Sequence, residues 1–216
     1  QGREYYRSEQ FNQSIILWIE AEHQFSSQRD FLNQALVLSN LALAHRQLGQ
    51  WAEAETTISK SLKILDEQKS LTNQSSRIYG QVLNTQGGLY LTQGNAEKAL
   101  ESWKQATEIY TQADYPEGKA KSLINQTHAL RSLGFLRESR DRLLQVEALL
   151  EKQTDIHLQI ALTRTLGDNQ RLMGELKASK ASLMKSLQLA EMLPMEEEVA
   201  GIQLSLGNTL QVIARQ

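Results

Sequence analysis

The stretch LGQWAEAETTISKSL, from Leu48 to Leu62, places one glycine between two runs whose apolar residues follow a helical spacing. The run before it, QALVLSNLALAHRQL, carries Leu38, Leu41 and Ala42 at the three-and-four spacing of an amphipathic helix. Glycine adopts the left-handed backbone conformation at a helix C-terminus without a steric penalty. The stretch therefore predicts a helical hairpin that turns at this glycine.

The composition favours a helical globular chain. Of 216 residues, 40% are hydrophobic and 22% are charged, and only two are proline. No stretch shows the apolar-polar alternation and β-branched enrichment of a strand, so we expect an all-α fold. The net charge of −2 gives no overall signal for nucleic acid or for an anionic membrane. The absence of cysteine excludes disulfides, thiolate metal ligands and a cysteine nucleophile.

Targeting signals are equally sparse. No apolar run approaches the roughly 18 residues that a membrane span needs. The first ten residues, QGREYYRSEQ, lack the basic and then apolar build of a signal peptide. We expect a cytoplasmic location, with an exported or periplasmic one left open.

The turn glycine recurs at a nearly constant interval. Its copies, which we call anchors, are Gly49, Gly94, Gly134 and Gly174. The intervals are 45, 40 and 40 residues, and a further 40 in each direction reaches Glu9 and Ala214. A fixed period of this length indicates a repeat architecture, in which each repeat packs on its neighbours.

Residues around each anchor repeat as well. Seven residues before it stands a small residue in most copies: Gly2, Ala42, Gly87, Thr127, Gly167 and Gly207. Five residues after it the side chain is small: Ser14, Ala54, Ala99, Ser139 and Ser179. Nine residues after it the side chain is large and apolar: Trp18, Ile58, Trp103, Leu143 and Leu183. Small residues let two helices approach closely and the large residue fills the space beside them, so each copy predicts a packed helix pair.

These positions resemble the tetratricopeptide repeat. The clearest copy is VLNTQGGLYLTQGNAEKALESWKQATEIY, whose matching residues are Gly87, Tyr90, Gly94, Ala99, Trp103 and Ala106. The copy around Gly134 is degenerate, because Thr127, Leu130 and Ser139 replace the usual Gly, Tyr and Ala. The resemblance implies a right-handed superhelical solenoid of antiparallel helix pairs.

The register predicts a single solenoid over residues 1–216, which we take to be a fragment because it begins and ends inside repeats. The repeats are 1–28 (partial), 35–68, 80–113, 120–153 and 160–193, with a closing helix in 200–216. We expect the extra residues around EQKSLTNQSSRIYG, and both prolines, to lie in exposed connections. The segments LNTQGGLYL, INQTHALRSLG and LSLGNTLQ are similar to repeats of bacterial, especially cyanobacterial, proteins with a caspase-like CHAT peptidase domain. That resemblance implies a sensory or regulatory arm of a larger protein.

Signals for catalysis are poor. The four histidines lack metal-ligand spacing, and no phosphate-binding GxxxxGK motif occurs. The acidic run Glu196–Glu198 falls at a predicted helix start, where carboxylates interact favourably with the helix dipole. We therefore expect no enzyme, no cofactor and no metal site.

The inner groove of such a solenoid is formed by the first helix of each pair. The candidate peptide-binding residues on this face are Asn40, Arg46, Asn84, Lys121, Asn125, His128, Arg131, Arg164 and Arg171. The groove positions hold five cations and one acid, Asp168. This balance favours binding of an acidic segment, from a partner or from a domain of the same full-length chain. The asparagines can bond to its backbone.

Two other classes of function stay open. The chain could be a structural or self-assembling scaffold whose basic groove only keeps that surface hydrated. An RNA-binding helical array is the weakest alternative, because the groove has no interleaved aromatic residues and the chain is acidic overall. We expect no nucleic acid or membrane partner. The sequence leaves the oligomeric state open.

Overall fold

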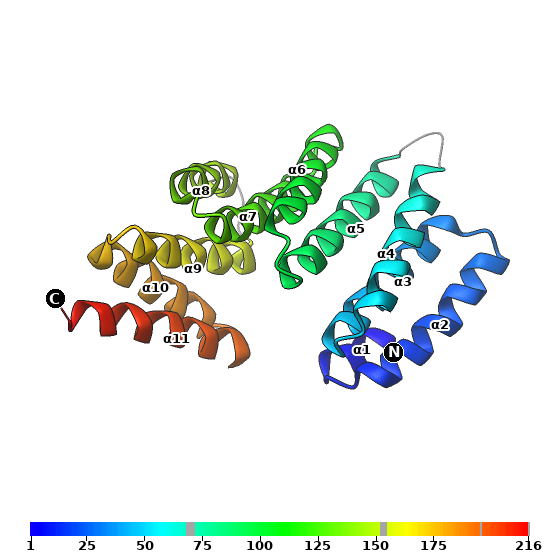
Figure 1. The fold of residues 1–216 in the computed structure, drawn as a ribbon, viewed down its shortest axis with the longest axis horizontal. Coiled ribbons are helices and arrows are strands. Elements are labelled where there is room, and N and C mark those ends of the chain that lie inside the picture. The colour runs from blue at the N-terminus through cyan, green and yellow to red at the C-terminus, as the bar shows by residue number, and fades with distance from the viewer. Residues whose placement is uncertain (68–71, 152–154, 195, 216) are drawn as a thin grey trace. The chain divides into compact units, whose positions relative to one another are not determined.

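A computed structural model describes residues 1–67, 72–151, 155–194 and 196–215. All regular secondary structure in these ranges is helical, in the order α1 Gly2–Arg7, α2 Phe11–Ser27, α3 Phe31–Gln47, α4 Trp51–Asp66, α5 Asn73–Thr92, α6 Ala96–Gln112, α7 Pro116–Ser132, α8 Leu136–Leu150, α9 Ile156–Leu172, α10 Leu176–Ala190 and α11 Glu196–Ile213. Figure 1 shows successive helices reversing direction at short turns. The predicted fold class, all-α with repeated antiparallel helix pairs, is confirmed. None of the described helices is long and apolar enough to cross a membrane.

The chain divides into two compact units. Unit 1 is Gln1–Lys119 and unit 2 is Ala120–Gln216, so the boundary falls inside α7. We call the first helix of each pair the A helix (α1, α3, α5, α7, α9) and the second the B helix. The closing helix α11 holds the position of a further A helix.

Each A helix from α3 onward ends at an anchor glycine in the left-handed conformation. The φ angles are 69° at Gly49 and 80° at Gly94, Gly134 and Gly174. The amide of Gly49 donates to the carbonyl of Arg46 (3.1 Å), and the amide of Gln50 donates to that of His45 (2.9 Å). The same pair of bonds recurs at the other three anchors. This is the Schellman motif, so the predicted turns are confirmed.

Among the described residues, three other than glycine share this backbone conformation. They are Glu9 (φ 57°), Arg29 (φ 57°) and Asp114 (φ 47°). Glu9 is the position that the 40-residue interval reaches upstream of Gly49, so the turn geometry persists where the glycine is absent. A residue with a Cβ carries a cost of roughly 1–2 kcal/mol in this conformation.

The small and large positions pack as predicted. The five small residues after the anchors, Ser14, Ala54, Ala99, Ser139 and Ser179, are fully buried, and the five large ones are at most 6% exposed. At Gly87, an added Cβ would lie 2.4 Å from Nε1 of Trp103. That nitrogen donates to the backbone carbonyl of Asn84 at 3.1 Å. Glycine is therefore required where the indole crosses the A helix.

Two expectations about the connections were wrong. Residues 73–80 of the stretch EQKSLTNQSSRIYG are helical, because α5 begins at Asn73 behind a capping box between Thr72 and Ser75. Positions 68–71 lie outside the described residues. Pro116 is the first residue of α7 instead of a connection residue, since proline suits the first helical position. The hairpins accordingly begin before the predicted repeat starts.

Candidate functional site

In unit 2, three arginines gather on neighbouring A helices. Arg131 lies on α7, and Arg164 and Arg171 lie on α9. Nη1 of Arg131 is 3.9 Å from Oδ2 of Asp168, which also lies on α9, and both side chains are less than one-fifth exposed. We call these four residues, with His128 of α7, the arginine cluster.

His128 is neutral in this cluster. Burial lowers its pKa to about 4, and the charges of Arg131 and Arg164 act in the same direction, while Asp168 opposes them. Burial also lowers the pKa of the Arg131 guanidinium, which stays charged near neutrality. At neutral pH the cluster thus carries three guanidinium charges, one carboxylate and an uncharged imidazole.

Two donors in the cluster lack acceptors. The Nε atoms of Arg131 and Arg171 are buried and have no hydrogen-bond partner among the described residues. A buried donor without a partner costs about 1–3 kcal/mol. Two of the three guanidinium groups are therefore only partly satisfied by the chain itself.

The third arginine has a carboxylate partner that the sequence analysis missed. Nη1 of Arg164 donates to Oε1 of Glu198 on α11 at 2.8 Å. Glu198 lies in the first turn of α11, as predicted for the acidic run, and it also reaches the groove face. Gly201 permits this contact, because a Cβ there would lie 2.7 Å from Nη2 of Arg164. The expectation of a single acid on this face was therefore wrong.

The other two candidates of unit 2 lie on α7. Lys121 is exposed and Asn125 is half-buried. Together with the arginine cluster and Glu198, the groove positions of unit 2 carry four cations and two carboxylates. The basic excess predicted from the sequence is present here, but it is smaller than expected.

The remaining candidates belong to unit 1. Asn40 of α3 is buried, and Arg46 of α3 and Asn84 of α5 are half-buried. An added Cβ at Gly88 of α5 would lie 2.9 Å from Nη1 of Arg46, so the arginine lies over α5. Burial leaves Asn40 little surface to offer a ligand, which the sequence pattern did not reveal.

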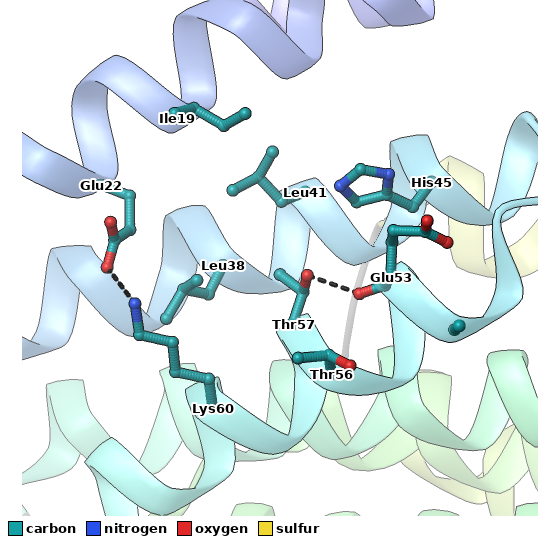
Figure 2. Close-up of a pocket in the computed structure, with 10 residues that line it drawn as sticks. Ile19, Glu22, Leu38, Leu41, His45, Glu53, Thr56, Thr57 and Lys60 are labelled. Atoms are coloured by element: carbon teal, nitrogen blue, oxygen red, sulfur yellow. Dashed lines mark hydrogen bonds and ion pairs between the residues drawn. The ribbon is translucent and has the colours of Figure 1, made fainter.

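Unit 1 also contains a pocket of about 460 Å³ between α2, α3 and α4. Figure 2 shows Ile19 of α2 facing Leu38 and Leu41 of α3. At one end, Oε1 of Glu22 accepts from Nζ of Lys60 at 2.8 Å and from Nε2 of Gln34 at 2.7 Å. None of the predicted groove residues lines this pocket.

The partners of Glu22 stabilise the ionised form of its carboxyl group. Burial would raise the pKa of this carboxyl, but the hydrogen bonds from Lys60 and Gln34 outweigh it and the pKa is lowered. A sequence signal existed, because Lys60 follows Glu22 by 38 residues, close to one repeat. Opposite charges one period apart lie on neighbouring B helices.

No group of three or more His, Cys, Asp or Glu residues in the described ranges could hold a metal ion.

The fold and its repeat register agree with the comparisons to known proteins. Residues 33–112 match the tetratricopeptide repeat family model. With the four identical glycine turns and the repeated small-large packing, this match supports a tetratricopeptide-repeat array. None of the curated proteins compared with the chain matches it.

Solved structures of low sequence identity share the fold. BtubC from P. vanneervenii matches with a TM-score of 0.77 at 12% identity, over 94% of this chain and 84% of that one. A signal transduction ATPase with a tetratricopeptide repeat sensor, from Pyrococcus horikoshii, matches with a TM-score of 0.78 at 14% identity over 96% of this chain. Aspartyl phosphate phosphatase F from Bacillus subtilis matches with a TM-score of 0.77 at 12% identity over 98% of this chain. The chain spans only 31% of the ATPase and 56% of the phosphatase.

Proposed function

We propose that the chain is a protein-interaction module that binds an acidic segment at the arginine cluster of unit 2. The observation that carries the proposal is the pair of buried guanidinium Nε donors, on Arg131 and Arg171, that have no partner in the described chain. The excess of cations over carboxylates on the same face supports a ligand of negative charge. Arginine pairs with carboxylates through two parallel hydrogen bonds, which gives such a site geometric selectivity.

Asp168 is the group that an incoming carboxylate would replace first. Its distance of 3.9 Å from Arg131 is beyond hydrogen-bond length, whereas Glu198 holds Arg164 at 2.8 Å. The neutral His128 adds no competing charge and offers one further donor or acceptor. A ligand carboxylate toward which Arg131 and Arg171 turn would accept hydrogen bonds from their Nε atoms, which have no acceptor among the described residues of the free protein.

The role of such binding in the whole protein is part of the same proposal. The Pyrococcus ATPase has a tetratricopeptide repeat sensor, and this chain shares the fold of part of that protein. We infer a sensory or regulatory arm that recognises an acidic segment, of a partner or of its own full-length protein. The resemblance to CHAT-associated repeats stays a prediction.

A titration of defined peptides tests the binding step. The probe is a labelled decapeptide of alternating Asp and Glu, compared with its Asn and Gln counterpart by fluorescence anisotropy at low and high salt. Arg171→Gln should weaken acidic-peptide binding about tenfold to a hundredfold, as expected for one charge-assisted contact. The matched control is Arg140→Gln on α8, where the arginine is paired with Glu175. Equal affinity for the acidic and neutral peptides would overturn the proposal.

A further inference from the structure

The pocket of unit 1 lies where its helix pair lacks a hydrogen bond that bridges two later pairs. In those pairs, a glutamine eight residues before the anchor accepts from the side chain eight residues after it: Gln86 from Ser102 at 3.0 Å and Gln126 from Arg142 at 3.1 Å. The pair α3 and α4 has Leu41 and Thr57 at these positions, and Oγ1 of Thr57 donates to a backbone carbonyl of its own helix. The pocket of about 460 Å³ therefore has an apolar floor where the later pairs have a polar bridge.

The two ends of this pocket differ in charge. At one end Glu22 and Lys60 neutralise each other. His45 and Glu53 line the opposite end (Figure 2). The carboxylate of Glu53 is exposed and has no hydrogen-bond or ion-pair partner among the described residues. One carboxylate of the pocket is thus left without a counter-ion, at the end formed by His45.

His45 places a second acceptor beside this carboxylate. Its Nδ1 is 2.7 Å from Oε1 of Gln50. An amide oxygen can only accept a hydrogen bond, so Nδ1 carries the proton and Nε2 of the neutral ring is an acceptor. Figure 2 shows the edge of the imidazole that points away from the backbone facing Leu41 and the interior of the pocket. A carboxylate and an imidazole nitrogen at one end of an apolar pocket suit a cationic hydrogen-bond donor.

The next repeat shows that an ammonium group fits at this place. The counterparts of His45 and Glu53, four residues before and after the anchor, are Tyr90 of α5 and Lys98 of α6. Nζ of Lys98 lies over the ring of Tyr90, 5.5 Å from its centroid, which is within the range of a cation–π interaction. There the chain supplies the cation from its own B helix. In the pocket the same position is a carboxylate, so the cation has to come from a ligand.

The apolar surface continues out of the pocket along α2. Ile19, which lines the pocket, is 43% exposed, and Ile16, one turn earlier on the same face, is 58% exposed. Ile16 stands seven residues after Glu9, as Thr56 of α4 stands seven after Gly49, so the surface extends toward the end formed by His45. The lining residues all belong to α2, α3 and α4, which places the pocket between consecutive helix pairs. An elongated apolar surface with one anionic end suits a helix better than a small molecule.

We propose that this pocket binds a helical segment of a partner protein that carries an apolar side chain and a lysine one turn apart. The apolar side chain would enter between Ile19 and Leu41, and the lysine ammonium would donate to Glu53 and to Nε2 of His45. The proposal is independent of the arginine cluster, because the pocket belongs to unit 1 and takes a ligand of the opposite charge.

A designed peptide tests the chemistry of the ligand. The probe is an end-capped, alanine-rich helix with one leucine and, four residues later, one lysine. It is compared with versions that carry glutamate for the lysine or glutamine for the leucine. Amide NMR shifts of the nitrogen-15-labelled 216-residue chain give the affinity and the place of binding. The leucine–lysine peptide should shift the amides around Leu41 and Glu53, and both altered peptides should bind at least about tenfold more weakly.

Two variants of the chain test the residues of the pocket. Glu53→Gln should weaken binding of the leucine–lysine peptide about fivefold, as expected for an exposed ion pair. Leu41→Gln introduces the glutamine that α5 and α7 have at this position, and should weaken it at least about tenfold. The matched control is Glu138→Gln, an exposed carboxylate in the same register on α8, which should bind as the wild type. Circular dichroism verifies that each variant is folded.

Three results would overturn the proposal. The first is equal affinity for the lysine and glutamate peptides. The second is a Glu53→Gln chain, at an exposed and therefore tolerant position, that binds the lysine peptide like the wild type. The third is a response of the pocket amides to octylammonium but not to the peptide, which would assign the pocket to a small amine.

Discussion

Arg164 and Glu198 join α9 to α11 through an ion pair of 2.8 Å, with each side chain about one-third exposed. The pair fixes the one arginine of the cluster that has a close carboxylate. Because Glu198 is a carboxylate of the chain itself, it occupies the guanidinium that an acidic ligand would use. Under the proposed binding mode, Glu198 would have to leave Arg164 before an acidic ligand could pair with that guanidinium.

Removing that carboxylate should strengthen binding of an acidic peptide. Glu198→Gln frees the Arg164 guanidinium, and affinity for the Asp/Glu decapeptide should rise several-fold, with a steeper dependence on salt. The partly exposed ion pair contributes little, so stability should fall by under about 1 kcal/mol. Peptide titration and urea unfolding measure the two effects. Glu197→Gln, on an exposed neighbour, is the control, and an equal gain in both variants would exclude a specific role for Glu198.

The half-buried His128 should make stability depend on pH between about 6.5 and 4. Its folded pKa is lowered to about 4, whereas an unfolded histidine titrates near 6.5. Across that window the unfolded chain binds the additional proton, so stability falls as the pH is lowered. His128→Gln should remove this part of the slope.

Urea unfolding at a series of pH values measures that difference between variant and wild type. The control is His157→Gln, at an exposed position near the start of α9. Unchanged slopes in His128→Gln would show that the imidazole is protonated in the folded state as easily as in the unfolded one.

The anchors could be predicted from the sequence because a turn of this kind favours a particular residue type, glycine, at one position. Gly134 and its counterparts stand where a left-handed residue is needed, and the small and large positions follow at fixed offsets. No local sequence pattern of this kind indicated the ion pair of Arg164 with Glu198. The acidic run already had a local explanation at the start of α11, and only the packing of α11 beside α9 brings it to the arginine.

The burial of the groove residues could not be predicted from the helical periodicity either. Periodicity assigned Asn40 to the groove face, but the residue is only 8% exposed. Periodicity likewise placed Arg131 on the groove face, yet its guanidinium lies beside Asp168 and is largely covered. Helical spacing gives the direction of a side chain from its own helix, and it does not give the depth at which the next helix packs.

The same change at two glycines should have opposite effects on stability. Gly134→Ala forces a Cβ into a turn with φ of 80° and should cost about 1–2 kcal/mol. Gly207→Ala lies inside α11 and should gain about 0.5–1 kcal/mol, because alanine restricts the unfolded chain. A Cβ at either site meets nothing within 4 Å, so the backbone alone decides the sign. Chemical denaturation measures both, and a loss of stability in Gly207→Ala would contradict the free space around that position.

The ion pair at the end of the unit 1 pocket should stabilise the fold near neutral pH and lose that effect in acid. Glu22 is buried and accepts hydrogen bonds from Lys60 and Gln34, which together lower its pKa despite the burial. A carboxyl with a lowered folded pKa stabilises the protein above its unfolded pKa of about 4.5, and this stabilisation disappears as the pH falls below that value. Glu22→Gln should therefore cost about 1–2 kcal/mol at pH 7, the size of a hydrogen bond to a charged group. The difference from wild type should shrink as the pH is lowered through about 4.

Glu20→Gln, at an exposed position of the same helix, should leave stability unchanged at every pH. A Glu22→Gln curve parallel to that of the wild type from pH 7 down to 3 would show that the carboxylate form gives the pocket no special stability.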